Sequence, residues 1–176
     1  MKIKLGIMQG RLSEKPGQNL QSFPYATWKD EFFFAKDLGL DFIEYLVDDV
    51  NDNLNPITNQ NGRKQIIELC RISNIKINSL CAHTFINDDF LDPSKLSNIN
   101  LKFYKIINWC EELDINNINV PINGLNNKKF EELKNMIIFF NQLKIPKIVN
   151  ILIETDLSAA VLKKFLESLK VKNVKI

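Results

Sequence analysis

Polar side chains follow, end or lie within a series of apolar and β-branched runs along the chain. The residues are Gln9, Arg11, Glu44, His83, Asn123 and Glu154. The last of them ends the run "KIVNILIET", in which both alternating faces are mostly apolar, as in a strand covered on two sides. Burying a carboxylate there costs free energy unless its charge is offset. A metal ion or a substrate hydroxyl at the strand end would offset it, so these positions are candidates for chemistry.

Short apolar runs alternate with helical segments over the whole chain. The runs begin near residues 3, 41, 75, 115, 147 and 172. Between them lie segments with helical spacing, for example Trp28, Phe32, Ala35 and Leu38. Unbroken alternation of this kind predicts a parallel sheet, either doubly wound or closed as a (β/α) barrel.

The nucleotide-binding signatures of the doubly wound sheet are missing. No G-x-G-x-x-G follows the first run, and no G-x-x-x-x-G-K-[ST] occurs. The barrel is therefore favoured. A complete eight-unit barrel needs about 250 residues, so residues 1–176 are predicted to form a single α/β domain, a (β/α) TIM barrel truncated to about six strands and five helices.

A barrel gathers the carboxyl ends of its strands at one rim, where such folds place their chemistry. We therefore expect Glu44, His83 and Glu154 near one mouth. Ending at a sixth strand would leave "IKLGIM" and "NVKI" as open edges, which attract a second copy of the chain. Leu5, Ile7 and Leu152 are expected to face the barrel interior and to add an apolar drive to association.

The segments "KLGIMQGRLS", "LGLDFIEY", "INSLCAH", "INVPI" and "ILIETD" occur in this order. In this series the sequence resembles the N-terminal portion of the sugar phosphate isomerase/epimerase family, which has the xylose-isomerase-like TIM barrel, and in particular its ketose-phosphate 3-epimerases. The resemblance implies a divalent metal, manganese or zinc, and a sugar or sugar phosphate as substrate.

Within this resemblance Glu154 matches the first of four metal ligands and one of two glutamates that transfer a proton next to the ketose carbonyl. The other ligands would follow the sixth, seventh and eighth strands, beyond Ile176. The resemblance therefore implies that this chain alone is inactive and binds metal weakly through Glu154. Glu44 and His83 are candidate substrate-binding residues.

Each candidate also has a structural interpretation. Glu154 would be stabilised beside a helix that begins near Ser158. A lone histidine such as His83 is often only hydrogen-bonded, and Glu44 would be structural if a partner such as Arg11 neutralised it.

An acidic segment invites a similar question. Asp88, Asp89 and Asp92 lie close together but lack the Gly and terminal Glu of a calcium loop, so a solvated loop is favoured.

Three functions remain open: an isomerase or epimerase, a non-catalytic remnant or association scaffold, and a metal-dependent nuclease like endonuclease IV. One histidine is too few for a multi-zinc nuclease site. The net charge of +2 with scattered lysines does not favour nucleic acid as a partner. Without an apolar membrane span or signal segment, the chain is predicted to be cytoplasmic, and its three cysteines to be reduced.

Overall fold

The computed structural model describes residues 3–13 and 21–175. Its strands form one sheet in which each strand pairs in parallel with its neighbour in the sequence, in the order β1-β2-β3-β4-β5-β6. The strands are β1 (Gly6–Met8), β2 (Phe42–Leu46), β3 (Lys76–Cys81), β4 (Asn117–Ile122), β5 (Asn150–Thr155) and β6 (Val174–Lys175). Sequential order with parallel pairing is the topology of a (β/α) barrel, and the predicted truncated barrel is confirmed.

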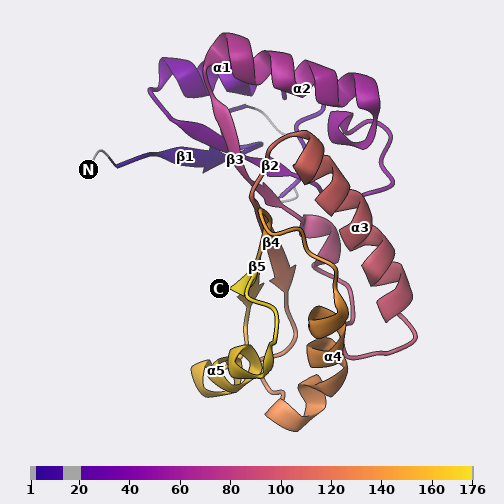
Figure 1. The fold of residues 1–176 in the computed structure, drawn as a ribbon. Coiled ribbons are helices and arrows are strands. Elements are labelled where there is room, and N and C mark those ends of the chain that lie inside the picture. Colours follow the sequence, from indigo (N-terminus) through magenta and orange to yellow (C-terminus); the bar gives the residue numbers. More distant parts are fainter. Residues whose placement is uncertain (1–2, 14–20, 176) are drawn as a thin grey trace.

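Helices fill the connections between the strands. The α-helices are α1 (Asp30–Asp37), α2 (Gln60–Ser73), α3 (Leu96–Glu112), α4 (Lys134–Gln142) and α5 (Ala159–Ser168), and the short 3-10 helices are η1 (Pro56–Thr58), η2 (His83–Phe85) and η3 (Phe130–Leu133). They lie in an arc around the sheet, from α1 and α2 at the top of Figure 1, along α3 and α4, to α5. Within the described residues, no helix is both long and apolar enough to cross a membrane.

Local sequence signals explain where α2 begins and ends. The side-chain oxygen of Asn59 accepts a hydrogen bond from the backbone N–H of Gly62 at 2.8 Å, a standard helix N-cap. At the other end Asn74 adopts a left-handed conformation with φ of 61°, which asparagine tolerates better than most residues. Arg63 ties this helix to α3 through Glu112, with a nitrogen–oxygen distance of 2.6 Å.

The sheet has an apolar face that packs on the helices. Ile43 and Tyr45 of β2, Ile118 of β4 and Ile151 of β5 are fully buried on this side. Ile7 is paired with Ile43 and therefore belongs to the same face. The expectation that Ile7 points into the barrel interior was wrong, because the register of β1 with β2 places Ile7 beside Ile43 and Met8 beside Glu44.

The opposite, concave face of the sheet carries polar side chains where β4 and β5 begin. Asn117 donates to the backbone oxygen of Asn78, and Asn150 donates to the side-chain oxygen of Asn117 at 3.2 Å. Lys175 donates in turn to the side-chain oxygen of Asn150 at 2.8 Å. Leu152 lies on this face beside Asn119, as predicted from the alternation. Hydrogen bonds from Asn117, Asn150 and Lys175 thus link β3, β4, β5 and β6 across the concave face.

An aromatic cluster forms the centre of the helix-side core. Its members, all at most 7% exposed, are Phe85, Phe90, Phe103, Phe139, Phe140 and Phe165. The rings of Phe85 and Phe103 stack with centroids 4.3 Å apart, and those of Phe90 and Phe140 stack at 5.8 Å. Because Phe85 ends η2, the cluster fixes the segment that follows β3 to helices α3 and α4.

Apolar side chains directly before the outer strand β1 lie in solvent. On the β1 side Ile3 is 76% exposed and Leu5 is 58% exposed. Unpaired edges of a sheet present free N–H and C=O groups to other chains. We therefore expect the protein to associate in a concentration-dependent manner through this edge.

Sedimentation equilibrium will measure this association. Leu5→Lys is expected to weaken it by about tenfold, because a charge directly beside the edge strand β1 opposes pairing with a second strand. Leu101→Lys is the matched control, since Leu101 is 63% exposed on α3, away from the edge. A monomer at every concentration, or an equal effect of both variants, would contradict the edge as the contact.

Candidate functional site at the mouth of the sheet

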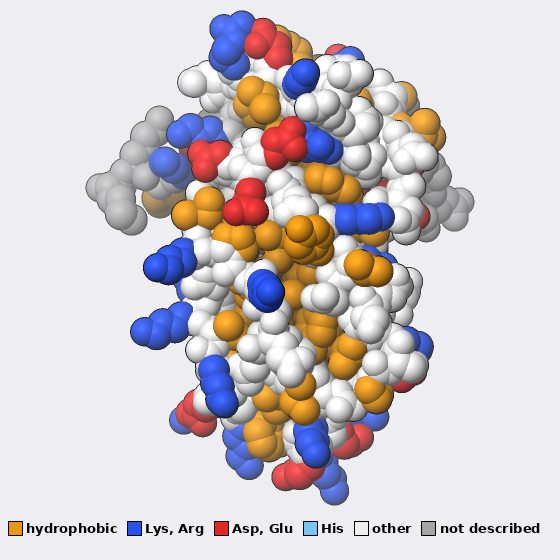
Figure 2. Space-filling model, turned by 45° about the vertical axis from the view of Figure 1, so that its right-hand side comes forward, with side chains coloured by type: hydrophobic (Ala, Val, Ile, Leu, Met, Phe, Trp, Pro, Cys, Tyr) orange, Lys and Arg blue, Asp and Glu red, His pale blue; other side chains and the backbone are white. Residues whose placement is uncertain are grey.

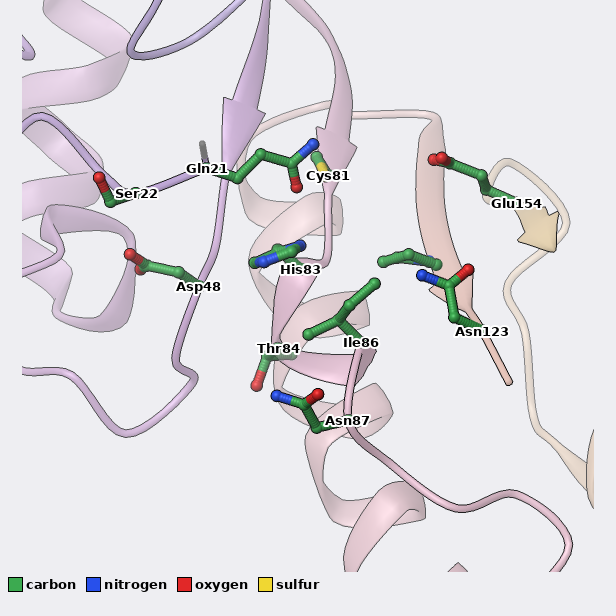
Figure 3. Close-up of a pocket in the computed structure, with 11 residues that line it drawn as sticks. Gln21, Ser22, Asp48, Cys81, His83, Thr84, Ile86, Asn87, Asn123 and Glu154 are labelled. Atoms are coloured by element: carbon green, nitrogen blue, oxygen red, sulfur yellow. The ribbon is translucent and has the colours of Figure 1, made fainter. Parts of the chain in front are cut away.

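A pocket of about 580 Å³ opens where the strands β2 to β5 end. Its lining comes from both the N-terminal and C-terminal halves of the chain (Figure 3). The lining residues are Gln21, Ser22, Asp48, Cys81, His83, Thr84, Ile86, Asn87, Pro121, Asn123 and Glu154. Of the three predicted site residues, the pocket brings His83 and Glu154 together, whereas Glu44 is not part of its lining.

Glu154 approaches the pocket from the end of β5 and is exposed. Its Oε2 lies 3.4 Å from the side-chain nitrogen of Asn119, which donates to it from the neighbouring strand β4. The pairing of Glu154 with Pro121 places it one layer above Asn119 and Leu152. A carboxylate in this position has lone pairs left for a ligand, a proton or a metal ion.

His83 lies between the two sides of the pocket, in η2 directly after β3 (Figure 3). Its Nδ1 atom is buried and has no hydrogen-bond partner among the described residues. Burial lowers the pKa of His83 below its ordinary value, and the negative charges of Asp48 and Glu154 oppose this shift. The imidazole is therefore neutral at pH 7 and can donate or accept one hydrogen bond to a ligand.

Glu44 lies deeper, in the middle of β2 beside Met8 and Ser79. The Ser79 hydroxyl donates to its Oε1 at 2.9 Å. Burial raises the pKa of Glu44, the Ser79 hydrogen bond opposes this, and the charge of Glu154 adds to the rise. The structure thus gives Glu44 a hydrogen-bonded position below the pocket, and its role in binding substrate stays a prediction.

Sequence reasoning missed two residues on the β2 side, Ser22 and Asp48. They lie together on one side of the pocket in Figure 3, with Asn123 and Glu154 on the other. Asp48 accepts a hydrogen bond from the Phe23 N–H through Oδ2 at 3.0 Å, but its Oδ1 and the Ser22 Oγ are buried without a partner among the described residues. The available signal was the position of Asp48, two residues after β2 ends.

The loop after β1 depends on another residue that the sequence did not single out. Glu31 of α1 is 1% exposed and accepts hydrogen bonds from the N–H groups of Gly10 and Leu12 and from the Ser13 hydroxyl, at 2.8, 3.1 and 2.8 Å. Gly10 has φ of 81°, a conformation that favours glycine. A buried carboxylate therefore explains the shape of the segment "MQGRLS".

Asp156 shapes the loop after β4 through hydrogen bonds, on the other side of the pocket mouth. Its two carboxylate oxygens accept the N–H groups of Gly124 and Leu125 at 2.9 and 2.8 Å. Gly124, with φ of 76°, turns the chain directly after Asn123. The loops after β1 and β4 are thus both shaped by a carboxylate from a different element.

The acidic segment after η2 has structural partners. Asp88 forms an ion pair with Lys102 at 2.7 Å, and Asp92 caps a turn through the Ser94 N–H. In residues 3–13 and 21–175 no group of three or more His, Cys, Asp or Glu side chains is arranged to hold a metal ion. The three cysteines are free thiols.

Comparison with known proteins rests on structure. No protein-family model and no curated protein matches the sequence. The fold is similar to a sugar phosphate isomerase/epimerase from Parabacteroides distasonis (13% identity, TM-score 0.64), covering 97% of this chain and 63% of that one. It is also similar to D-psicose 3-epimerase solved in the presence of D-fructose (15% identity, TM-score 0.62), and the match covers 98% of this chain and 62% of that one. The fold is similar as well to an AP endonuclease of family 2 from Brucella melitensis (11% identity, TM-score 0.62), and the match covers 99% of this chain and 67% of that one.

The fold is therefore that of the xylose isomerase-like TIM barrels, as the resemblance implied. This chain spans 63% and 62% of the two isomerase or epimerase structures. Structures with this fold include one with a bound zinc atom and one in complex with magnesium. Identities of 11 to 15% to an epimerase and to an endonuclease establish the fold alone.

Proposed function

We propose that the protein is part of a sugar isomerase or epimerase and that the pocket at the mouth binds a ketose or ketose phosphate. Glu154 is the base that removes a proton next to the ketose carbonyl. The observation that carries the proposal is the meeting of Glu154 and His83, from β5 and the end of β3, in a pocket otherwise lined mainly by hydroxyl and amide side chains.

The chain's own residues divide the work between holding and reacting. Glu154 has free lone pairs at the pocket surface, while Asn119 holds one of its oxygens. His83, Asn123 and Asn87 can hydrogen-bond substrate hydroxyls from the other walls. A hydroxyl-rich ligand needs several donors and acceptors at fixed positions, and this lining supplies both.

A divalent metal fits this site only in part. Glu154 is the one residue that the family resemblance assigns as a ligand, and one carboxylate does not make a four-ligand shell. Cys81 lines the pocket, but burial and the charges of Glu44 and Glu154 raise its pKa to about 12, so the thiol stays protonated and is a poor ligand. The proposed chemistry therefore relies on Glu154 itself as the base.

Calorimetry with manganese and zinc tests the metal assignment. We expect weak binding by the 176-residue chain, reduced about tenfold by Glu154→Gln, because the variant keeps the size but loses the charge of the ligand. Glu167→Gln is the control, because Glu167 is exposed on α5, outside the pocket. Tight, stoichiometric binding that survives Glu154→Gln would place the metal elsewhere.

The same samples test the function. Nuclear magnetic resonance titration with ketoses is expected to shift the backbone resonances of residues that line the pocket. Conversion of the ketose to its epimer at the carbon next to the carbonyl, followed with manganese present, is expected to be undetectable for this chain alone, because one glutamate can remove the proton but a second must return it on the other side. Absence of any ketose-induced shift at the pocket would refute the proposed function.

A further inference from the structure

We propose that the pocket recognises an unphosphorylated, neutral polyhydroxy ligand through Ser22, Asp48 and His83, and that it disfavours phosphorylated sugars. This inference rests on the proposed function, and it names the substrate class of the same pocket. Two independent observations carry it: the unpartnered polar atoms of three residues that line the pocket and the sign of the charges in its lining.

Three polar atoms of the lining residues are buried and unpartnered among the described residues: Ser22 Oγ, Asp48 Oδ1 and His83 Nδ1. Leaving a buried polar atom unpaired costs free energy, so such groups in folded proteins usually have a partner. All three belong to residues that line one pocket, from the segment before α1, the end of β2 and the end of β3. A ligand that enters the pocket would be their partner.

The chemistry of these atoms selects hydroxyl groups. Asp48 accepts hydrogen bonds only, whereas the Ser22 hydroxyl both donates and accepts. The neutral imidazole of His83 offers either a donor or an acceptor at Nδ1. A pair of neighbouring hydroxyl groups can donate to the carboxylate and also accept from the serine, whereas a phosphate dianion offers acceptors only.

The charges of the lining point the same way. Asp48 and Glu154 are the acidic side chains among the described lining residues, which contain no Lys or Arg. The lysine on the neighbouring helix, Lys102, is engaged with Asp88 at 2.7 Å and with the backbone oxygen of Thr84. A phosphate placed in this pocket would meet two carboxylates and none of the cations that normally bind phosphate.

The test is a resonance titration of the whole chain with D-fructose, D-fructose 1-phosphate and D-fructose 6-phosphate. The two phosphates place the charge at opposite ends of the sugar, so the result does not depend on its orientation in the pocket. We expect D-fructose to shift the backbone resonances of pocket residues and to bind at least about tenfold more tightly than either phosphate.

Asp48→Asn separates the charge from the shape of the pocket. The variant keeps an oxygen for the Phe23 N–H, and we expect it to weaken D-fructose binding about tenfold and to narrow the preference over the phosphates. Asp49→Asn makes the same change of charge on the adjacent, exposed residue, whose carboxylate accepts from the Asn51 N–H. It is expected to change neither the affinity for D-fructose nor the preference for D-fructose over the phosphates. A purely structural effect of Asp48→Asn would weaken all three ligands equally.

The possible outcomes are distinct. Phosphates that bind as tightly as D-fructose, or a preference unchanged in Asp48→Asn, would overturn the inference and leave the proposed function standing. Failure of all three ligands to shift pocket residues would overturn both.

Discussion

Phe103→Ala is expected to lower the free energy of unfolding by about 3–5 kcal/mol, the usual cost of removing a large buried ring from a core. Phe103 is fully buried and packs against four other rings of the aromatic cluster, Phe85, Phe90, Phe139 and Phe140. A domain of this size is stable by only about 5–15 kcal/mol. The variant would therefore lose a large part of its stability, measured by urea unfolding followed by circular dichroism.

Tyr104→Ala is the matched control on the next position of α3. Tyr104 is 67% exposed, so its loss is expected to change the free energy of unfolding by less than about 0.5 kcal/mol. Phe103→Ala should also disturb the resonances of His83. Phe85 stacks on Phe103 and lies two residues after His83 in η2. Similar losses in both variants would show that the aromatic cluster is not the centre of the core.

Glu31→Gln is expected to cost about 1.5–3 kcal/mol, the range for hydrogen bonds to a charged group. The carboxylate accepts from two backbone N–H groups and one hydroxyl in the loop after β1. The amide has one oxygen instead of two, so at least one of these donors would lose its acceptor in a buried place. Urea unfolding measures the loss, and the resonances of Gly10 and Leu12 report where it occurs.

Asp30→Asn provides the comparison for Glu31→Gln. It removes the same charge from the adjacent position in the first turn of α1, but its side chain is exposed. Only the interaction with the helix N-terminus is lost, typically less than about 1 kcal/mol. If both variants lose the same stability, the buried hydrogen bonds of Glu31 contribute nothing beyond the helix dipole.

The architecture could be predicted from the sequence because it depends on long patterns. Six apolar runs and five helical segments in alternation admit few arrangements, and the structure contains the predicted strands in the predicted order. Which side chains of a very short strand face the helices is harder to predict. β1 has three residues, and its register with β2, not the alternation alone, decides that Ile7 faces the helices.

The site was predictable where a residue directly follows or ends a strand. This is why Glu154 and His83 meet in one pocket. Glu31 and Asp48 could not be found in this way, because their roles depend on hydrogen bonds to loops 18 to 25 residues away in the sequence. Glu44 illustrates a further limit: alternation gives the face of a strand, but its depth below the rim depends on the register of neighbouring strands.

The strictly sequential order of the strands also bears on how the chain folds. Every ladder joins strands that follow one another, such as Gly6 with Phe42 and Ile151 with Val174. Each new strand therefore finds its partner among residues already synthesised, and closing each loop costs an entropy that grows only slowly with its length. Folding can advance from the N-terminus during translation, with the last strand formed serving as the template for the next.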